Sequence, residues 1–157
     1  MPPGARPGAQ RGLTLIELMV VMVVLGLLSS LAVLKWIDLS RTAFAAKIAS
    51  QFTLVRLAAY NYEADHQNQW PAEQSAGIVP PEMMPYLPSG FSFDQGMYKL
   101  DWDNRTPEMM PYQIAISMTT TDARLMNVVG VNLGSKAPYY RAGNRLTFIL
   151  IDPNGNY

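Results

Sequence analysis

The sequence predicts an α+β fold in which one long N-terminal helix packs on a small antiparallel sheet. Two observations support this prediction. Residues 13–64 contain no proline and are apolar or amphipathic throughout, and the segments that favour strands follow only after residue 96. A helix that precedes a run of strands is typical of this class, because the strands pair with one another and the helix covers one face of their sheet.

The first part of the expected helix has the length and composition of a membrane span. Between Leu13 and Leu34 there are 22 residues, and Glu17 is the only charged one. At 1.5 Å per residue they would extend about 33 Å, close to the thickness of a bilayer core. Arg6 and Arg11 precede this segment, which favours a cytoplasmic N-terminus and export of the rest of the chain.

The second part of the expected helix is amphipathic. Apolar side chains recur mostly at three- and four-residue steps, which is the spacing of one helix face; they are Ile37, Phe44, Ile48, Phe52, Val55, Ala59 and Tyr62. A single helix over residues 13–64 would be roughly 75–80 Å long. We therefore expect its second part to pack on the domain that follows.

Residues 65–96 are rich in proline and glycine and predict a long irregular connection. Its apolar side chains would anchor it to the domain; they are Trp70, Ile78, Val79, Tyr86, Leu87 and Phe91. The hexapeptide Pro-Glu-Met-Met-Pro-Tyr occurs at 81–86 and again at 107–112. We interpret the copies as two similar turns, and the alternative is a methionine-rich contact surface.

The last third of the chain predicts three strands and one short helix. Residues 97–102, 112–118 and 145–151 alternate apolar with polar or small side chains, and a turn at 152–155 follows the last of them. Residues 121–129 predict a helix that Thr121 or Asp122 caps. The residues expected to end this helix are Gly130, Asn132 and Gly134.

Composition argues against several classes of function. Twelve basic and twelve acidic residues cancel, so there is no basic surface typical of nucleic-acid binding, and no nucleic-acid partner is expected. The chain contains no cysteine, which excludes disulfides, thiolate metal sites and a cysteine nucleophile. His66 is the only histidine, and without cysteine or a second histidine the chain has few ligands for a zinc site and few residues for a Ser-His-Asp triad. We interpret His66 as a solvated loop residue.

Three interpretations compete for residues 1–34. The segment could be a secretory signal peptide cleaved after Ala32, or an uncleaved signal anchor. In both, Glu17 is merely tolerated near the cytoplasmic interface. In the third interpretation, a short leader is removed before the apolar segment, and Glu17 has a role of its own.

The third interpretation rests on the stretch Gly12-Leu13-Thr14-Leu15-Ile16-Glu17-Leu18-Met19-Val20-Val21. It resembles the N-terminal signature of type IV prepilins and type II secretion pseudopilins. The resemblance implies cleavage after Gly12 by a prepilin peptidase and methylation of the new amine on Leu13. Glu17 then becomes the fifth residue of the mature chain. Leu13 departs from the phenylalanine most common in the family, and Leu34 from the proline of many major pilins.

The resemblance also implies a pilin-like fold in three segments. These are a leader at 1–12, a transmembrane and filament-core half of the helix at 13–34, and a periplasmic domain at 35–157. The expected location is the bacterial inner membrane, with a single pass, and then a pseudopilus or pilus. The implied partners are the prepilin peptidase, other copies or related pilin subunits, and an inner-membrane assembly platform.

The role of Glu17 follows from the cost of burying a charge. A lone carboxylate or ammonium inside a helix bundle would each cost several kcal/mol. Pairing Glu17 with the Leu13 amine of a neighbouring copy would offset both costs and set the axial register. The sequence thus predicts a structural assembly subunit with no catalysis of its own. A signal-anchored or secreted periplasmic binding module is the alternative, and an exported enzyme comes third.

Asp101 and Asp103 are weak candidates for a calcium site. Alternating oxygen ligands suit calcium, and the major pseudopilins that the chain resembles can bind it in this half of the domain. Polar residues at the end of a strand explain the pair equally well. No other cofactor is expected.

Overall fold

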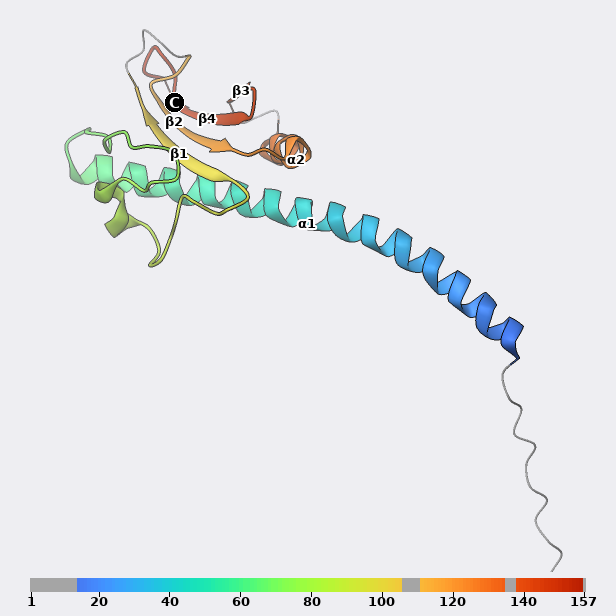
Figure 1. Cartoon of the computed structure of the whole chain (residues 1–157). Helices are drawn as coiled ribbons and strands as arrows, with labels where there is room; N and C mark the ends of the chain where they lie inside the picture. Colours follow the sequence, from blue (N-terminus) through green and yellow to red (C-terminus); the bar gives the residue numbers. More distant parts are fainter. Residues whose placement is uncertain (1–13, 106–110, 135–137, 157) are drawn as a thin grey trace, which may run out of the picture. The chain divides into compact units, whose positions relative to one another are not determined.

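The computed structural model describes residues 14–105, 111–134 and 138–156. Its elements, in chain order, are the helix α1 (Leu15–Asp65), the 3₁₀-helix η1 (Pro81–Tyr86), β1 (Lys99–Asn104), β2 (Ile114–Thr119), α2 (Ala123–Leu133), β3 (Tyr139–Ala142) and β4 (Arg145–Ile151) (Figure 1). The α+β prediction, with a long first helix and an antiparallel sheet, is confirmed. The chain divides into two compact units, Met1–Leu39 and Ser40–Tyr157, and α1 contributes to both.

Helix α1 confirms the long helix predicted over residues 13–64. It spans 51 residues and ends at Asp65. Gln67 and Asn68 then adopt left-handed backbone conformations, with φ of 55° and 65°. The Asn68 N–H donates to the carbonyl of Glu63 at 3.2 Å. This satisfies a carbonyl that the end of a helix leaves without an intrahelical donor.

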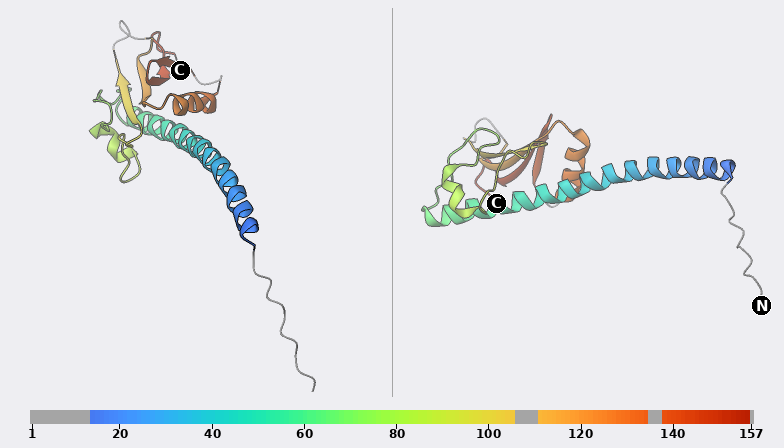
Figure 2. Two further views of the ribbon diagram at one scale, coloured as in Figure 1. Left: turned by 45° about the vertical axis from the view of Figure 1, so that its right-hand side comes forward. Right: turned by 60° about the horizontal axis from the view of Figure 1, so that its bottom comes forward.

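In the unit Ser40–Tyr157, α1 lies along one face of the sheet, and α2 packs on the same face (Figure 2). The predicted apolar face of the helix is the buried one, because Ile48, Phe52 and Val55 are at most 1% exposed. Phe52 stacks on Phe148 of β4, with 6.0 Å between ring centroids. Burying this face is what fixes the second half of α1 to the sheet.

The described strands form one antiparallel sheet in the order β1-β2-β4-β3. Strand β4 has the predicted bounds, whereas β1 and β2 each begin two residues later than predicted. Strand β3 was missed, because all four of its residues are exposed and show no alternation. A two-residue turn joins it to β4, and Gly143 provides the positive φ of 58° that such a turn requires.

The two faces of the sheet differ in chemistry. Strand residues that face the helices are apolar, and Leu100, Trp102 and Ile116 among them are fully buried. The alternate residues point to the opposite face. There four buried side chains are polar, namely Asp101, Asp103, Ser117 and Thr147. A polar set buried this deeply requires internal partners.

Helix α2 is longer than the predicted 121–129. Asp122 caps it, because Asp122 Oδ1 accepts from the backbone N–H groups of Arg124 and Leu125 at 2.9 and 3.0 Å. Of the residues expected to end it, Gly130 and Asn132 continue the helix, so that part of the prediction was wrong. Only Gly134, with φ of 73°, ends it. Gly130 is buried, and its backbone does not have a positive φ, so it continues the helix.

Gly130→Ala is expected to stabilise the protein. A Cβ at this position would meet nothing nearer than the Tyr139 hydroxyl at 3.9 Å, which is ordinary contact. Alanine also has the higher helix propensity, so the free energy of unfolding should rise by about 0.5–1 kcal/mol. Gly134→Ala is the matched control and should lower it, because its φ of 73° strains an L-residue. Urea unfolding of the full chain in detergent micelles measures both, and equal effects would contradict this account.

The connection between α1 and β1 contains η1, which is the first copy of the repeated hexapeptide. Met83 of this copy is fully buried, whereas Met84 is 58% exposed. Val79 is buried, and four other predicted anchors pack against the core: Trp70, Tyr86, Leu87 and Phe91. Ile78 was wrongly predicted as an anchor, since it is 52% exposed. The second copy, 107–112, lies mostly outside the described residues.

Candidate assembly site and a buried polar network

Glu17 lies in the first turn of α1 and binds the start of its own helix. Its Oε2 accepts from the Thr14 N–H at 2.9 Å and from the Thr14 hydroxyl at 2.8 Å. In return, the Glu17 N–H donates to Thr14 Oγ1 at 3.3 Å. These reciprocal bonds form a capping box, which satisfies backbone donors at the helix start.

Thr14 was not predicted to be the partner of Glu17. The pattern Thr14-Leu15-Ile16-Glu17 carries the signal, since a threonine three residues before a glutamate at the head of an apolar run is typical of a capping box. Gly12 and Leu13, the predicted cleavage and methylation residues, lie outside the described residues. Glu17, the predicted assembly residue, is described.

The helix after Glu17 presents an apolar surface on all sides. Its large apolar residues between Leu15 and Leu39 are 41–77% exposed. α1 is long and apolar enough to cross a membrane, and its most apolar 18-residue window has a mean hydropathy of 2.5 with none of the window buried. The Ser30 hydroxyl donates to the Leu27 carbonyl at 2.8 Å, which reduces the cost of placing this polar group in an apolar medium.

Asp101 and Asp103 lie side by side on the polar face of the sheet and share one arginine. Arg145 Nη2 lies 2.8 Å from Asp101 Oδ2, and 2.6 and 2.5 Å from the two carboxylate oxygens of Asp103. The Ser117 hydroxyl donates to Asp103 at 2.5 Å. Arg105 Nε also donates to Asp103, at 3.2 Å. Asp103 is therefore the centre of the network.

Asp101 is less well satisfied than Asp103. Its side chain is 5% exposed, and its Oδ1 has no hydrogen-bond partner among the described residues. Burial raises the pKa of the Asp101 carboxyl to about 6, and the negative charge of Asp103 adds to this effect. The contact with Arg145 lowers the pKa but does not offset the burial.

The calcium site at Asp101 and Asp103 stays a prediction. Arg145 already contacts both carboxylates, so a calcium ion would have to displace its guanidinium. Within residues 14–105, 111–134 and 138–156 no three acidic or histidine side chains are grouped to hold a metal. If calcium binds here, millimolar Ca²⁺ should raise the melting temperature of the full chain more than equal Mg²⁺. The increase should disappear in Asp103→Asn.

His66 occupies the exposed position that we predicted for it. Its ring stacks on Tyr62, with centroids 4.0 Å apart, and its Nδ1 lies 2.8 Å from the Tyr62 carbonyl oxygen. These contacts are local to the end of α1. They give His66 a role in ending the helix.

Comparison with known proteins identifies the start of the chain. Residues 8–33 match the family described as the prokaryotic N-terminal methylation motif. This is the prepilin-type signature, so the resemblance stated from residues 12–21 is confirmed. No curated protein and no solved structure matches the chain significantly.

Proposed function

From the premise that this chain carries the prepilin-type signature of type IV pilins and pseudopilins, we propose that it is a structural subunit polymerised through α1. The motif supports processing by a prepilin peptidase and assembly with other pilin subunits. The filament would be a type II secretion pseudopilus or a type IV pilus-like fibre. Neither role requires catalysis by the subunit itself.

The observation that carries the proposal is the combination of one carboxylate with an unpartnered apolar helix. Glu17 is followed by apolar residues that remain exposed as far as Leu39. A bilayer covers such a surface before assembly, and the helices of other copies cover it afterwards. The Glu17 carboxylate would then find its charge partner in the Leu13 amine of a neighbouring copy.

The same features support a location and an orientation. The motif and the long apolar helix fit anchoring in the inner membrane. We place residues 1–12 in the cytoplasm as the leader, 13–34 in the bilayer, and 35–157 outside it. The inner-membrane assembly platform would be the partner that extracts the processed subunit into the filament.

The mature N-terminus tests the proposal most directly. We expect mass spectrometry of the protein from its native membrane to show a chain that begins at Leu13 and carries a methylated amine. A chain that begins at Val33 would indicate a secretory signal peptide. An intact Met1 would indicate an uncleaved anchor. Either of those results would favour a periplasmic binding module over a filament subunit.

A further inference from the structure

One edge strand of the sheet, β1, is covered by another segment of the chain, whereas the other edge strand, β3, is exposed. The connection before β1 covers the edge of that strand, because Leu100 accepts from the Gly77 N–H at 2.8 Å and donates to the Phe93 carbonyl at 2.8 Å. At the other edge, β3 pairs with β4, and all four of its residues are exposed. Among the described residues no segment covers the outer side of β3. An open edge of this kind can accept another strand.

The register shows which backbone groups face outward from β3. The Ile149 N–H donates to the Pro138 carbonyl at 2.9 Å, which makes 138 and 149 a hydrogen-bonded pair. Such pairs alternate along an antiparallel ladder, so Tyr140 and Ala142 also bond to β4. The backbone N–H and C=O groups of Tyr139 and Arg141 therefore point away from the sheet.

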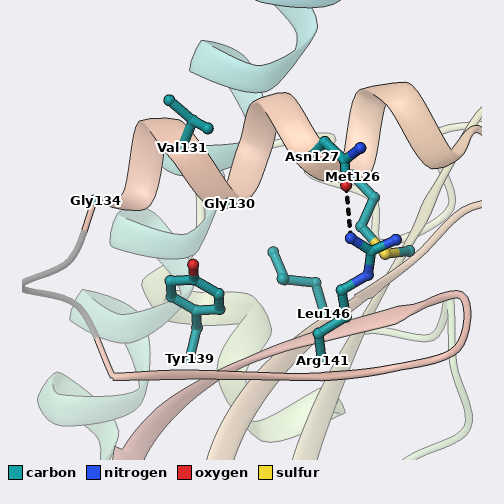
Figure 3. A pocket seen from close by; sticks show the side chains of 8 residues that line it. All are labelled: Met126, Asn127, Gly130, Val131, Gly134, Tyr139, Arg141 and Leu146. Carbon is teal, nitrogen blue, oxygen red and sulfur yellow. Dashed lines mark hydrogen bonds between the residues drawn. The ribbon is translucent and has the colours of Figure 1, made fainter.

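The same two residues line a groove between β3 and α2. Their side chains point toward the helix (Figure 3). The groove has a volume of about 440 Å³, and its lining residues are Met126, Asn127, Gly130, Val131, Gly134, Tyr139, Arg141 and Leu146. Leu146 and Met126 are 1% exposed and form an apolar base, whereas Val131 at the rim is 79% exposed. The groove can thus take an apolar side chain from a strand paired with β3.

Arg141 gives this surface a charge preference. Its Nη1 donates to Asn127 Oδ1 at 2.6 Å, and this acceptor is neutral. Three other arginines of the domain are paired with carboxylates: Arg41 with Asp122, Arg105 with Glu73, and Arg145 with Asp103. In the part of the chain that the structure describes, Arg141 has no such pair. A carboxylate on the incoming strand would complement it.

We propose that the open edge of β3 and its groove bind an extended segment of another protein by strand addition. The segment would place an apolar side chain in the groove and, two residues away on the same face, a carboxylate against Arg141. The backbone groups of Tyr139 and Arg141 would supply the main-chain hydrogen bonds. This interaction is independent of the helix contacts that would build a filament.

Designed pentapeptides provide the probe. Acetyl-Thr-Leu-Thr-Asp-Thr-amide and its reversed order, Thr-Asp-Thr-Leu-Thr, present leucine and aspartate on one face for either strand direction. We expect the better of the two to bind the full chain in detergent micelles. Its binding should slow hydrogen exchange at the amides of Tyr139 and Arg141, while those of Tyr140 and Ala142 remain slow throughout. N-methylation of the peptide amides that face β3 should weaken binding at least about tenfold.

Two variants of one residue separate backbone pairing from charge. Arg141→Pro removes an outward N–H that β4 does not use, and proline is tolerated on edge strands. It should abolish binding. Arg141→Ala keeps the N–H and should weaken binding roughly fivefold, to about the level of a peptide with lysine in place of aspartate. If Arg141→Pro unfolds, the N-methylated peptides make the same test on the unaltered chain.

The opposite results are equally clear. Equal binding of the N-methylated and unmodified peptides would overturn strand addition. Failure of both peptides to slow exchange at Tyr139 and Arg141 would show that the arginine merely protects an open edge. If the chain alone forms a dimer that Arg141→Pro dissociates, the strand that pairs with β3 comes from a second copy. This result would overturn the proposal that it comes from another protein.

Discussion

Glu17→Ala is expected to enter the membrane and lose its leader normally but to fail in assembly. Insertion depends on the apolar residues after Glu17, which the substitution leaves unchanged. In an assembled bundle the Leu13 amine would have no carboxylate partner, and an unpaired buried charge costs several kcal/mol. We expect the incorporation of subunits into filaments to fall by at least about a hundredfold, since 1.4 kcal/mol already corresponds to a factor of ten. Quantification of sheared filaments against the membrane-bound pool measures it.

Glu17→Gln separates the charge of Glu17 from its capping role. Glutamine can still accept from the Thr14 N–H, as in the capping box found here. It cannot form an ion pair with an amine. We expect this variant to be as defective in assembly as Glu17→Ala, while the processed fraction equals that of the unaltered chain. Normal assembly of the glutamine variant would mean that Glu17 serves the helix start and that the proposed pairing between copies is wrong.

The parts of the fold that the sequence predicted are those with a strong local pattern. Proline is absent over fifty residues, and the buried positions of α1 recur at helical spacing, so the helix could be predicted almost to its last residue. Strand β4 alternates clearly, and its bounds were right. Strand β3 has four exposed residues, and its stability comes from pairing with β4, which no local pattern reveals. Gly130 was misjudged because a glycine marks the end of a helix where the backbone takes a positive φ, and here that occurs at Gly134.

The candidate sites differ in the same way. Glu17 could be singled out because one acid in an apolar run is a local anomaly, and its bond to Thr14 spans only three residues. Asp101 and Asp103 were noticed as alternating carboxylates, but their partner Arg145 lies more than forty residues away. Sequence spacing cannot supply a contact that depends on the order of strands in a sheet. The sequence also does not distinguish the two aspartates, although both carboxylate oxygens of Asp103 accept hydrogen bonds and Asp101 Oδ1 accepts none among the described residues.

Asp103→Asn is expected to destabilise the domain strongly. Asp103 is completely buried and accepts from Arg145, Arg105 and Ser117. Removing its charge leaves Arg145 paired with Asp101 alone and Arg105 with Glu73 alone. Because both arginines are partly exposed, we expect a loss of roughly 2–4 kcal/mol, at or below the range for a fully buried pair. Urea unfolding of the full chain at pH 7.5, followed by near-ultraviolet circular dichroism, measures the loss. A change below about 0.5 kcal/mol, the range of ordinary surface substitutions, would contradict the central role of Asp103.

Asp101→Asn should have a much smaller effect at the same pH and should alter the pH dependence instead. Because burial raises the pKa of Asp101 to about 6, the folded state holds a proton that the unfolded state releases near pH 4. Between these values the folded state binds more protons, so the contribution of Asp101 to stability falls as the pH rises from about 4 to about 6 and is constant above that. Asparagine has no charge to lose, so the slope over this window should be less negative in Asp101→Asn than in the unaltered chain. Unfolding curves at pH 4.5, 5.5 and 6.5 measure both slopes, and identical slopes would show that Asp101 is ionised throughout, with Arg145 outweighing its burial.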